Sequence, residues 1–227
     1  MRRILITLTA IIISFGVRAQ IEEPRSILEI GVAGGANFSS MEFQPTVRQN
    51  NLMGYNGGVS ISYTSEKYFK MICAAQLEFN FSQRGGEEDF DDKTGNSFSR
   101  CLNYLEIPFF AHLAFGKEPP GMQFYINLGP QIGILLGDSE EYTGEWNIDS
   151  RPSATQNIYG KQIDNKFDYG IAGGIGLELK TKAGNFFIEG RYYYGLGDIF
   201  NNSKTDDFGR SANTTISARL GYSIRIL

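Results

Sequence analysis

Long segments in which apolar and polar side chains alternate recur throughout this chain. In the stretches 69–82 and 216–226, for example, every second residue is apolar and the residues between, apart from Ile72, are small, polar or charged, so an extended backbone would have one apolar face. Most of these segments hold 12 residues or more, whereas strands of globular sheets usually have about 5 or 6. We expect eight strands, at residues 27–38, 53–65, 69–84, 101–115, 122–137, 166–180, 185–197 and 212–226.

The connections between these segments alternate between long and short. Polar stretches at 39–52, 85–100, 138–165 and 198–211 are long, whereas those at 65–68, 116–121 and 181–184 are short. Long external loops and short periplasmic turns, with both chain ends in the periplasm, are typical of outer-membrane barrels. This pattern indicates that the apolar face points to lipid, because alternation alone would also fit a soluble ligand-binding barrel with an apolar interior.

Aromatic residues on the apolar face fall into two groups. Five lie toward the short turns and seven toward the long loops: Tyr63, Phe69, Phe115, Phe124 and Phe186, then Phe38, Tyr55, Phe81, Phe167, Tyr169, Tyr192 and Tyr194. Two aromatic girdles around an aliphatic band are typical of a barrel in a bilayer, although aromatics are also common in strands generally. The sequence predicts an all-β fold, an eight-stranded antiparallel up-and-down transmembrane β-barrel, with bulges at Pro108 and Pro130.

The first residues predict export. Met1-Arg2-Arg3, an apolar run to Val17 and small residues up to Ala19 form a secretory signal peptide over residues 1–19, cleaved after Ala19, with the barrel domain over 20–227. A membrane anchor helix is the alternative, but it needs about 20 apolar residues. Without residues 1–19 the chain has 18 basic and 25 acidic residues, which argues against nucleic acid as a partner.

Five segments carry a resemblance to a known family. They are "EIGVAGGANFSS", "NYLEIPFFAHLAF" at 103–115, "INLGPQIGILLG" at 126–137, "DYGIAGGIGLEL" at 168–179 and "FIEGRYYYGLGDI" at 187–199. Together they resemble the small outer-membrane β-barrel, or PorT-like, family of Bacteroidetes, and "YLEIP" with "LGP" is the most specific part. The resemblance implies a barrel in the outer membrane rather than a reaction. One branch of that family serves protein secretion, but no residue assigns this chain to it. The ending Arg225-Ile226-Leu227 also lacks the aromatic last residue frequent in proteobacterial barrels.

Charged residues of both signs fall on the inward face. Because charges in a narrow lumen must pair or stay hydrated, we expect a network of carboxylates and cations. An eight-stranded barrel is just wide enough for side chains to fill it, which favours a plugged lumen over a pore. We also expect Glu106 and Glu178 each to lie beside an inward Arg or Lys. The predicted network comprises Glu29, Glu78, Arg84, Glu106, Glu178, Glu189, Arg191, Arg219 and Arg225, with Lys70 and Lys180 on the same face.

His112 is the only histidine and shares the inward face with Tyr104, Glu106 and Phe110. A histidine beside a serine or aspartate can activate a nucleophile against an acyl ester, which would make the barrel a lipid-modifying enzyme. However, His112 falls near a periplasmic turn, whereas outer-leaflet lipid lies at the other end. We therefore expect a lumen histidine bonded to a neighbour, and no catalytic residue.

The external loops are acidic, and the third contains aromatics. The segment 85–96 and the third loop could hold calcium or bridge to lipopolysaccharide, but their spacing does not match an EF-hand, so we expect solvated loops with no metal or cofactor. Tyr142, Trp146, Ile148 and Tyr159 form a candidate partner loop, unless they only pack the loop on itself.

The sequence thus favours a non-enzymatic structural or interaction platform. Its expected partners are outer-membrane lipid, lipopolysaccharide and proteins that contact the external loops or the periplasmic turns. A narrow, porin-like channel is the main alternative. Cys73 and Cys101 are the only cysteines. Residue 111 would lie opposite Cys73, which places the two sulfurs roughly 30 Å apart at about 3.3 Å per residue, so we expect two free thiols.

Overall fold

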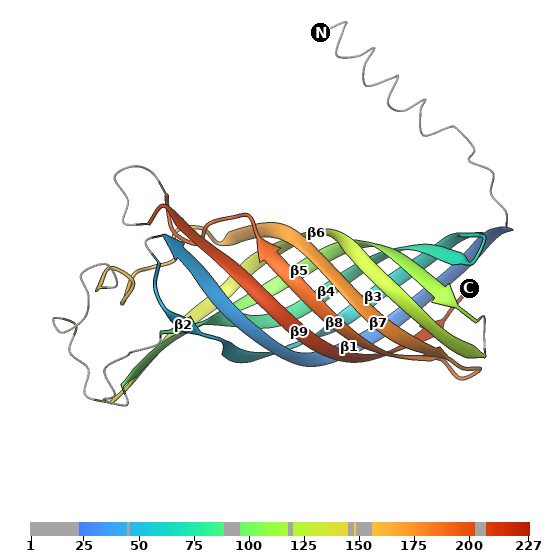
Figure 1. The fold of residues 1–227 in the computed structure, drawn as a ribbon, viewed down its shortest axis with the longest axis horizontal. Coiled ribbons are helices and arrows are strands. Elements are labelled where there is room, and N and C mark those ends of the chain that lie inside the picture. Colours follow the sequence, from blue (N-terminus) through green and yellow to red (C-terminus); the bar gives the residue numbers. More distant parts are fainter. Residues whose placement is uncertain are drawn as a thin grey trace, which may run out of the picture.

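The computed structural model describes residues 23–44, 46–88, 96–117, 120–144, 148, 156–202 and 208–227. These residues form a barrel of long tilted strands (Figure 1). The strands are β1 (Glu23–Gln44), β2 (Gln49–Asn50), β3 (Leu52–Tyr68), β4 (Met71–Glu88), β5 (Ser97–Gly116), β6 (Gly121–Thr143), β7 (Phe167–Lys180), β8 (Asn185–Gly195) and β9 (Arg210–Arg225).

Each long strand pairs antiparallel with its neighbours, and the sheet closes on itself. The pairing runs β4-β3-β1-β9-β8-β7-β6-β5, and β5 pairs back to β4. The two-residue strand β2 adds only a short ladder at the end of β4, where Gln49 faces Glu88. The prediction of an eight-stranded antiparallel up-and-down barrel is confirmed. No helix among the described residues is long and apolar enough to cross a membrane.

The strands extend further than predicted toward the long loops. For example, the segment predicted as 101–115 begins at Ser97, and the one predicted as 122–137 ends at Thr143. Ser97 pairs with Thr143, so the ladder continues through mostly polar residues that do not continue the apolar alternation. We call this end of the barrel the loop end.

The opposite end, which we call the turn end, holds the β3–β4 turn at 69–70, the β5–β6 turn near 117–120 and the β7–β8 turn at 181–184. The first of these turns was predicted at 65–68, but strand pairing continues to Tyr68 opposite Met71. Phe69 takes a left-handed backbone with φ of 54°. Lys70 is consequently exposed in this turn, and the prediction that it lies on the inward face is wrong.

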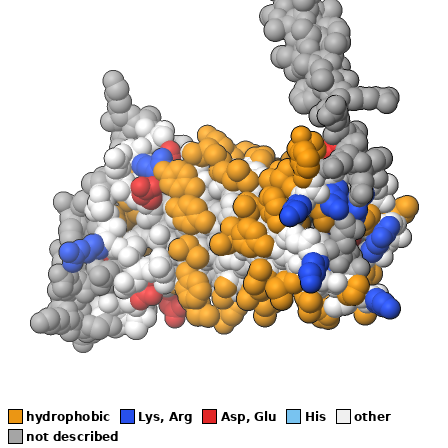
Figure 2. All heavy atoms as spheres, turned by 45° about the vertical axis from the view of Figure 1, so that its right-hand side comes forward, with side chains coloured by type: hydrophobic (Ala, Val, Ile, Leu, Met, Phe, Trp, Pro, Cys, Tyr) orange, Lys and Arg blue, Asp and Glu red, His pale blue; other side chains and the backbone are white. Residues whose placement is uncertain are grey.

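The predicted facing of the strands is confirmed. Apolar side chains such as Val32 (54 % exposed) and Leu128 (59 %) point outward, and Figure 2 shows hydrophobic side chains in a band across the face of the barrel wall in view. Polar residues on the opposite face of the same strands, such as Asn37 on β1 and Asn127 on β6, are buried. This inside-out arrangement is that of a barrel whose outer wall meets lipid.

The two prolines interrupt hydrogen-bonded ladders without shifting the register, so the prediction of bulges is wrong. Pro108 lies at a gap in the β4–β5 ladder, and Leu77 pairs with Phe109 in the register that Asn80 and Glu106 continue. Pro130 lies at a gap in the β5–β6 ladder. Each proline lacks only its own donor, because the strands on both sides are long enough to hold the alignment.

Both cysteines are free thiols, as predicted. Cys73 pairs with Leu113, near the turn end, rather than with residue 111. Cys101 pairs with Gly85 and Ser139 at the loop end. The shift of two residues from the predicted register increases the separation of the two sulfurs.

Candidate functional site

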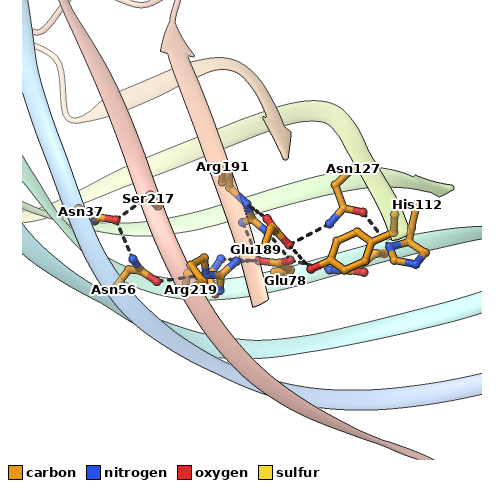
Figure 3. A network of polar contacts seen from close by, with 12 residues as sticks. Asn37, Asn56, Glu78, His112, Asn127, Glu189, Arg191, Ser217 and Arg219 are labelled. Atoms are coloured by element: carbon orange, nitrogen blue, oxygen red, sulfur yellow. Dashed lines mark hydrogen bonds and ion pairs between the residues drawn. The ribbon is translucent and has the colours of Figure 1, made fainter. Parts of the chain in front are cut away.

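The centre of the lumen is occupied by a carboxylate shared between two arginines (Figure 3). Glu78, on β4, accepts two hydrogen bonds from Arg191 at 2.8 and 2.9 Å and one from Arg219 at 2.8 Å. Asn80 and Gln76 donate to the same carboxylate at 2.8 and 2.6 Å. Arg191 comes from β8, on the far side of the barrel from β4. We call Glu78, Glu189, Arg191 and Arg219 the central layer, which spans the lumen with balanced charge.

Glu189 links the central layer to the only histidine. Its carboxylate accepts a bond from Arg191 Nε at 2.6 Å and bonds from Tyr125 and Asn127 at 3.1 Å each. Asn127 Oδ1 in turn lies 2.8 Å from His112 Nδ1, and the His112 ring lies 4.8 Å from that of Tyr125. The expectation that His112 is bonded to a lumen neighbour is confirmed.

A second layer lies toward the loop end. Arg84, on β4, is fully buried and forms ion pairs with Glu106 on β5 and, at 2.9 Å, with Asp168 on β7. The rings of Tyr104 and Tyr193 lie 5.1 and 4.2 Å from its guanidinium carbon. Such charge-assisted bonds and cation–π contacts compensate the guanidinium for lost hydration. We call these residues the upper layer.

A third layer lies toward the turn end. Lys180 Nζ is 3.3 Å from Glu29 Oε1 and 3.3 Å from Glu178 Oε2. Asn185 donates to Glu29 at 2.9 Å and to Ser223 at 3.2 Å. The prediction for Glu106 and Glu178 is confirmed, since each lies against an inward cation, although Glu178 is held by an ion pair without good hydrogen-bond alignment.

The loop end of the lumen is closed by apolar side chains. They form one buried cluster, which we call the cap: Met41, Phe43, Val47, Phe98, Leu102, Tyr104, Leu135, Ile158, Ile199, Phe200 and Phe208. The ring centroids of Phe43 and Phe208 are 5.2 Å apart, and those of Phe200 and Phe208 are 5.6 Å apart. Segments on both sides of the barrel mouth therefore meet over the lumen.

Little space remains between the layers. A void of about 10 Å³ lies among Asn37, Glu106, Arg191 and Arg219, and one of about 30 Å³ lies beside His112. A cavity needs about 10–15 Å³ to hold a single water molecule. The smaller void thus has room for about one water molecule and the larger for about two, and neither admits a larger solute.

The structure brings eight of the nine predicted network residues into these layers and leaves Arg225 out. Arg225 is exposed at the turn end, and its Nε donates to the Leu227 carbonyl at 2.8 Å. By alternation Arg225 is on the inward-pointing face of β9, as predicted. However, it lies beyond Ser223, the last buried residue of that strand, and is therefore exposed to solvent. The predicted set also lacked Asp168, although the alternation of β7 places it inward.

A buried arginine outside the predicted set anchors the third loop. Arg100, on β5, pairs with Glu140 on β6 and donates to the Lys161 carbonyl. Glu140 also accepts from the Gly160 backbone at 3.0 Å. The sequence placed Arg100 in a loop because no apolar alternation surrounds it.

The candidate partner loop is partly packed against the loop end of the barrel. Tyr159 donates to Glu88 at 2.6 Å, and its ring lies 4.9 Å from that of Phe98. Tyr142 donates to Glu140, and burial together with that carboxylate raises the pKa of Tyr142 to about 12. Ile148 is exposed, and Trp146 lies outside the described residues. Among the described residues, no group of acidic, histidine and cysteine side chains could hold a metal ion.

Comparison with known proteins decides the family. The model of the outer membrane protein beta-barrel domain family matches residues 18–201. The chain belongs to this family. It is therefore an outer-membrane β-barrel, and the bilayer explains its apolar outer wall. No curated protein sequence matches the chain.

Several solved structures are similar in fold. Neisserial surface protein A is 11 % identical with a TM-score of 0.41, and the match covers 87 % of this chain and 97 % of that one. Ail of Yersinia pestis, in complex with the heparin analogue sucrose octasulfate, is 18 % identical with a TM-score of 0.38, covering 87 % and 99 %. OprG of Pseudomonas aeruginosa is 11 % identical with a TM-score of 0.36, covering 90 % and 99 %.

Proposed function

We propose that this protein is a closed, non-enzymatic barrel that presents its external loops as an interaction platform. The observation that carries this proposal is the closure of the lumen by the central layer, the upper layer and the cap. Opening a path for solutes would require the buried ion pairs to separate. A buried charge that loses its partner destabilises the protein by about 3–5 kcal/mol.

A narrow channel is the second candidate, because the lumen is lined by polar side chains. The void of about 10 Å³ among Asn37, Glu106, Arg191 and Arg219 argues against conduction, since it is close to the minimum for one water molecule. The charges there are fully engaged in ion pairs and are not arranged as a file of hydrated sites.

The third loop supports the role of a platform. Arg100, Glu140 and the Gly160 backbone hold its base against the barrel rim. Tyr142 and Ile148 remain 40 % and 44 % exposed, so an anchored loop offers apolar surface to a protein partner. The outer wall contacts membrane lipid and the surrounding lipopolysaccharide.

The proposal excludes catalysis by His112. Its recorded partner is the side-chain amide of Asn127, which can neither serve as a nucleophile nor be activated as one, and the residue lies toward the turn end, away from outer-leaflet lipid. A His112→Ala strain should retain its lipid composition, and altered lipid acylation in that strain would support the enzyme alternative.

We further propose that the chain is exported by a signal peptide over residues 1–19 and that the barrel domain is residues 20–227. The "YLEIP" and "LGP" segments support a place among the small barrels of Bacteroidetes. Amino-terminal sequencing of the protein from outer membranes should begin at Gln20, and a start at Met1 would contradict cleavage.

Planar-bilayer recording tests the closed lumen. The purified wild-type barrel should show no discrete conductance above the leak. The Phe200→Ala/Phe208→Ala variant, which opens only the cap, should also be silent, because the upper and central layers remain. Reproducible unit openings of the wild-type protein would instead support the channel.

A further inference from the structure

The turn end of the barrel contains a cavity that the closed lumen does not explain. It has a volume of about 290 Å³ and lies among β1, β3, β4, β6 and the β7–β8 turn. We call it the turn-end cavity. It shares Glu29 with the smaller void beside His112, and the central layer closes it beyond that point. In outer-membrane barrels the short turns face the periplasm, so this cavity is a blind pocket open to that compartment.

The volume indicates the size of the occupant. Small-molecule sites usually measure about 300–1,000 Å³, so this cavity is at the lower limit of that range. It fits one or two amino-acid residues and is too narrow for a folded partner.

A buried acceptor in the wall of the cavity has no partner among the described residues. Gln123, on β6, is 1 % exposed, and its Nε2 donates to the Lys117 carbonyl at 3.0 Å. Its Oε1 is buried without a hydrogen bond in the described part of the chain. A buried acceptor left unsatisfied is costly, so a small rotation of the Gln123 amide toward the cavity, which brings Oε1 to an N–H group of a ligand there, would be favourable.

The rim of the cavity is cationic. Lys182, in the β7–β8 turn, and Arg225, at the end of β9, both line it and are exposed. Within the described residues Lys182 forms no ion pair, and the recorded bond of Arg225 is to a backbone carbonyl. Deeper inside, Lys180 is already balanced by Glu29 and Glu178. Charge complementarity therefore places an anionic group of the ligand at the rim.

The cavity also has an apolar wall. Ile27 and Ile72 line it from β1 and β4. A ligand that matches all three features has a carboxylate, an adjacent N–H donor and an aliphatic side chain.

We propose that the turn-end cavity binds the carboxyl-terminal residue of a peptide in the periplasm. The carboxylate lies at Lys182 and Arg225, the backbone N–H of the ligand donates to Gln123 Oε1, and an aliphatic side chain packs on Ile27 and Ile72. This site is at the opposite end of the barrel from the external loops, so it does not rest on the platform proposed above.

The test uses the full barrel in lipid nanodiscs and two blocked dipeptides, acetyl-Gly-Leu with a free carboxylate and acetyl-Gly-Leu-amide. Calorimetric or NMR titration should show saturable binding of the acid and at least about tenfold weaker binding of the amide, as expected for a lost charge-assisted contact. Equal affinities for acid and amide, or no binding of the acid, would overturn the proposal.

Variants distinguish the site from general attraction to cations. Lys182→Gln and Arg225→Gln should each weaken binding of the acid about tenfold without affecting the amide. Gln123→Leu should weaken both. Lys70→Gln removes a cation from the same end of the barrel but outside the cavity, and it should bind like the wild type. A loss with Lys70→Gln as large as that with Lys182→Gln would also overturn the proposal.

Discussion

Replacing Glu78 with glutamine removes the charge that two arginines share at the centre of the lumen. Glu78, Glu189, Arg191 and Arg219 together are neutral, and the variant leaves one uncompensated positive charge. The side-chain NH2 of the glutamine would also face the N–H groups of the arginines, and two donors cannot form a hydrogen bond. Because loss of one partner from a buried ion pair costs about 3–5 kcal/mol, we expect the free energy of unfolding of Glu78→Gln to fall by that amount.

Urea unfolding in lipid vesicles, followed by the circular dichroism of the β-sheet, measures this change. Forward and reverse titrations must coincide for the free energies to be valid. Glu42→Gln is the matched control, since Glu42 forms a 3.0 Å ion pair with Arg210 at the exposed loop end. That loss should cost no more than about 1 kcal/mol. If Glu78→Gln is destabilised no more than Glu42→Gln, the central layer is not a buried ion-pair cluster.

Three further predictions concern topology, thiols and packing. A peptide tag in 150–156 should be labelled on intact cells and one in 118–120 should not, and equal labelling would refute the orientation. Both cysteines should react with a maleimide after unfolding without reductant. If neither cysteine reacts, the two sulfurs are joined, which the strand register excludes. At Gly176 an added Cβ would lie 2.3 Å from a tyrosine ring carbon, so Gly176→Ala should cost about 1–3 kcal/mol of unfolding free energy, whereas lipid-facing Gly190→Ala, with open space around it, should not.

The fold and the facing of each strand could be predicted because both depend on a local pattern. Alternation places Glu78 and Arg191 on the face opposite that of Val32, and the long and short connections then indicate that the polar face is the inner one. A strand cannot slip by one residue without reversing every side chain. That Glu106 would lie beside an inward cation followed from the need to compensate buried charge, whereas the structure identifies that cation as Arg84.

The parts that could not be predicted depend on contacts between distant segments. Phe43, Phe200 and Phe208 lie in or beside segments expected to be loops, and nothing local indicates that they meet over the lumen. The strand extensions at Arg100 show no apolar alternation, so the pattern that marks the other strand residues ends before the strands do. Arg225 is on the face of its strand that points to the lumen, but alternation does not show where along the strand the enclosed lumen ends.

Solvent exchange of the arginine Nε–H protons tests the closed lumen most directly. In the structure these protons are donated to Glu106 by Arg84, to Glu189 by Arg191 and to Asn56 by Arg219. Nitrogen-15 NMR of the barrel in nanodiscs should therefore show three Nε–H signals strongly protected from exchange with water, and a fast-exchanging signal from the exposed Arg225. If all of the arginine signals exchange as fast as that of Arg225, the lumen is open to water and the account is wrong.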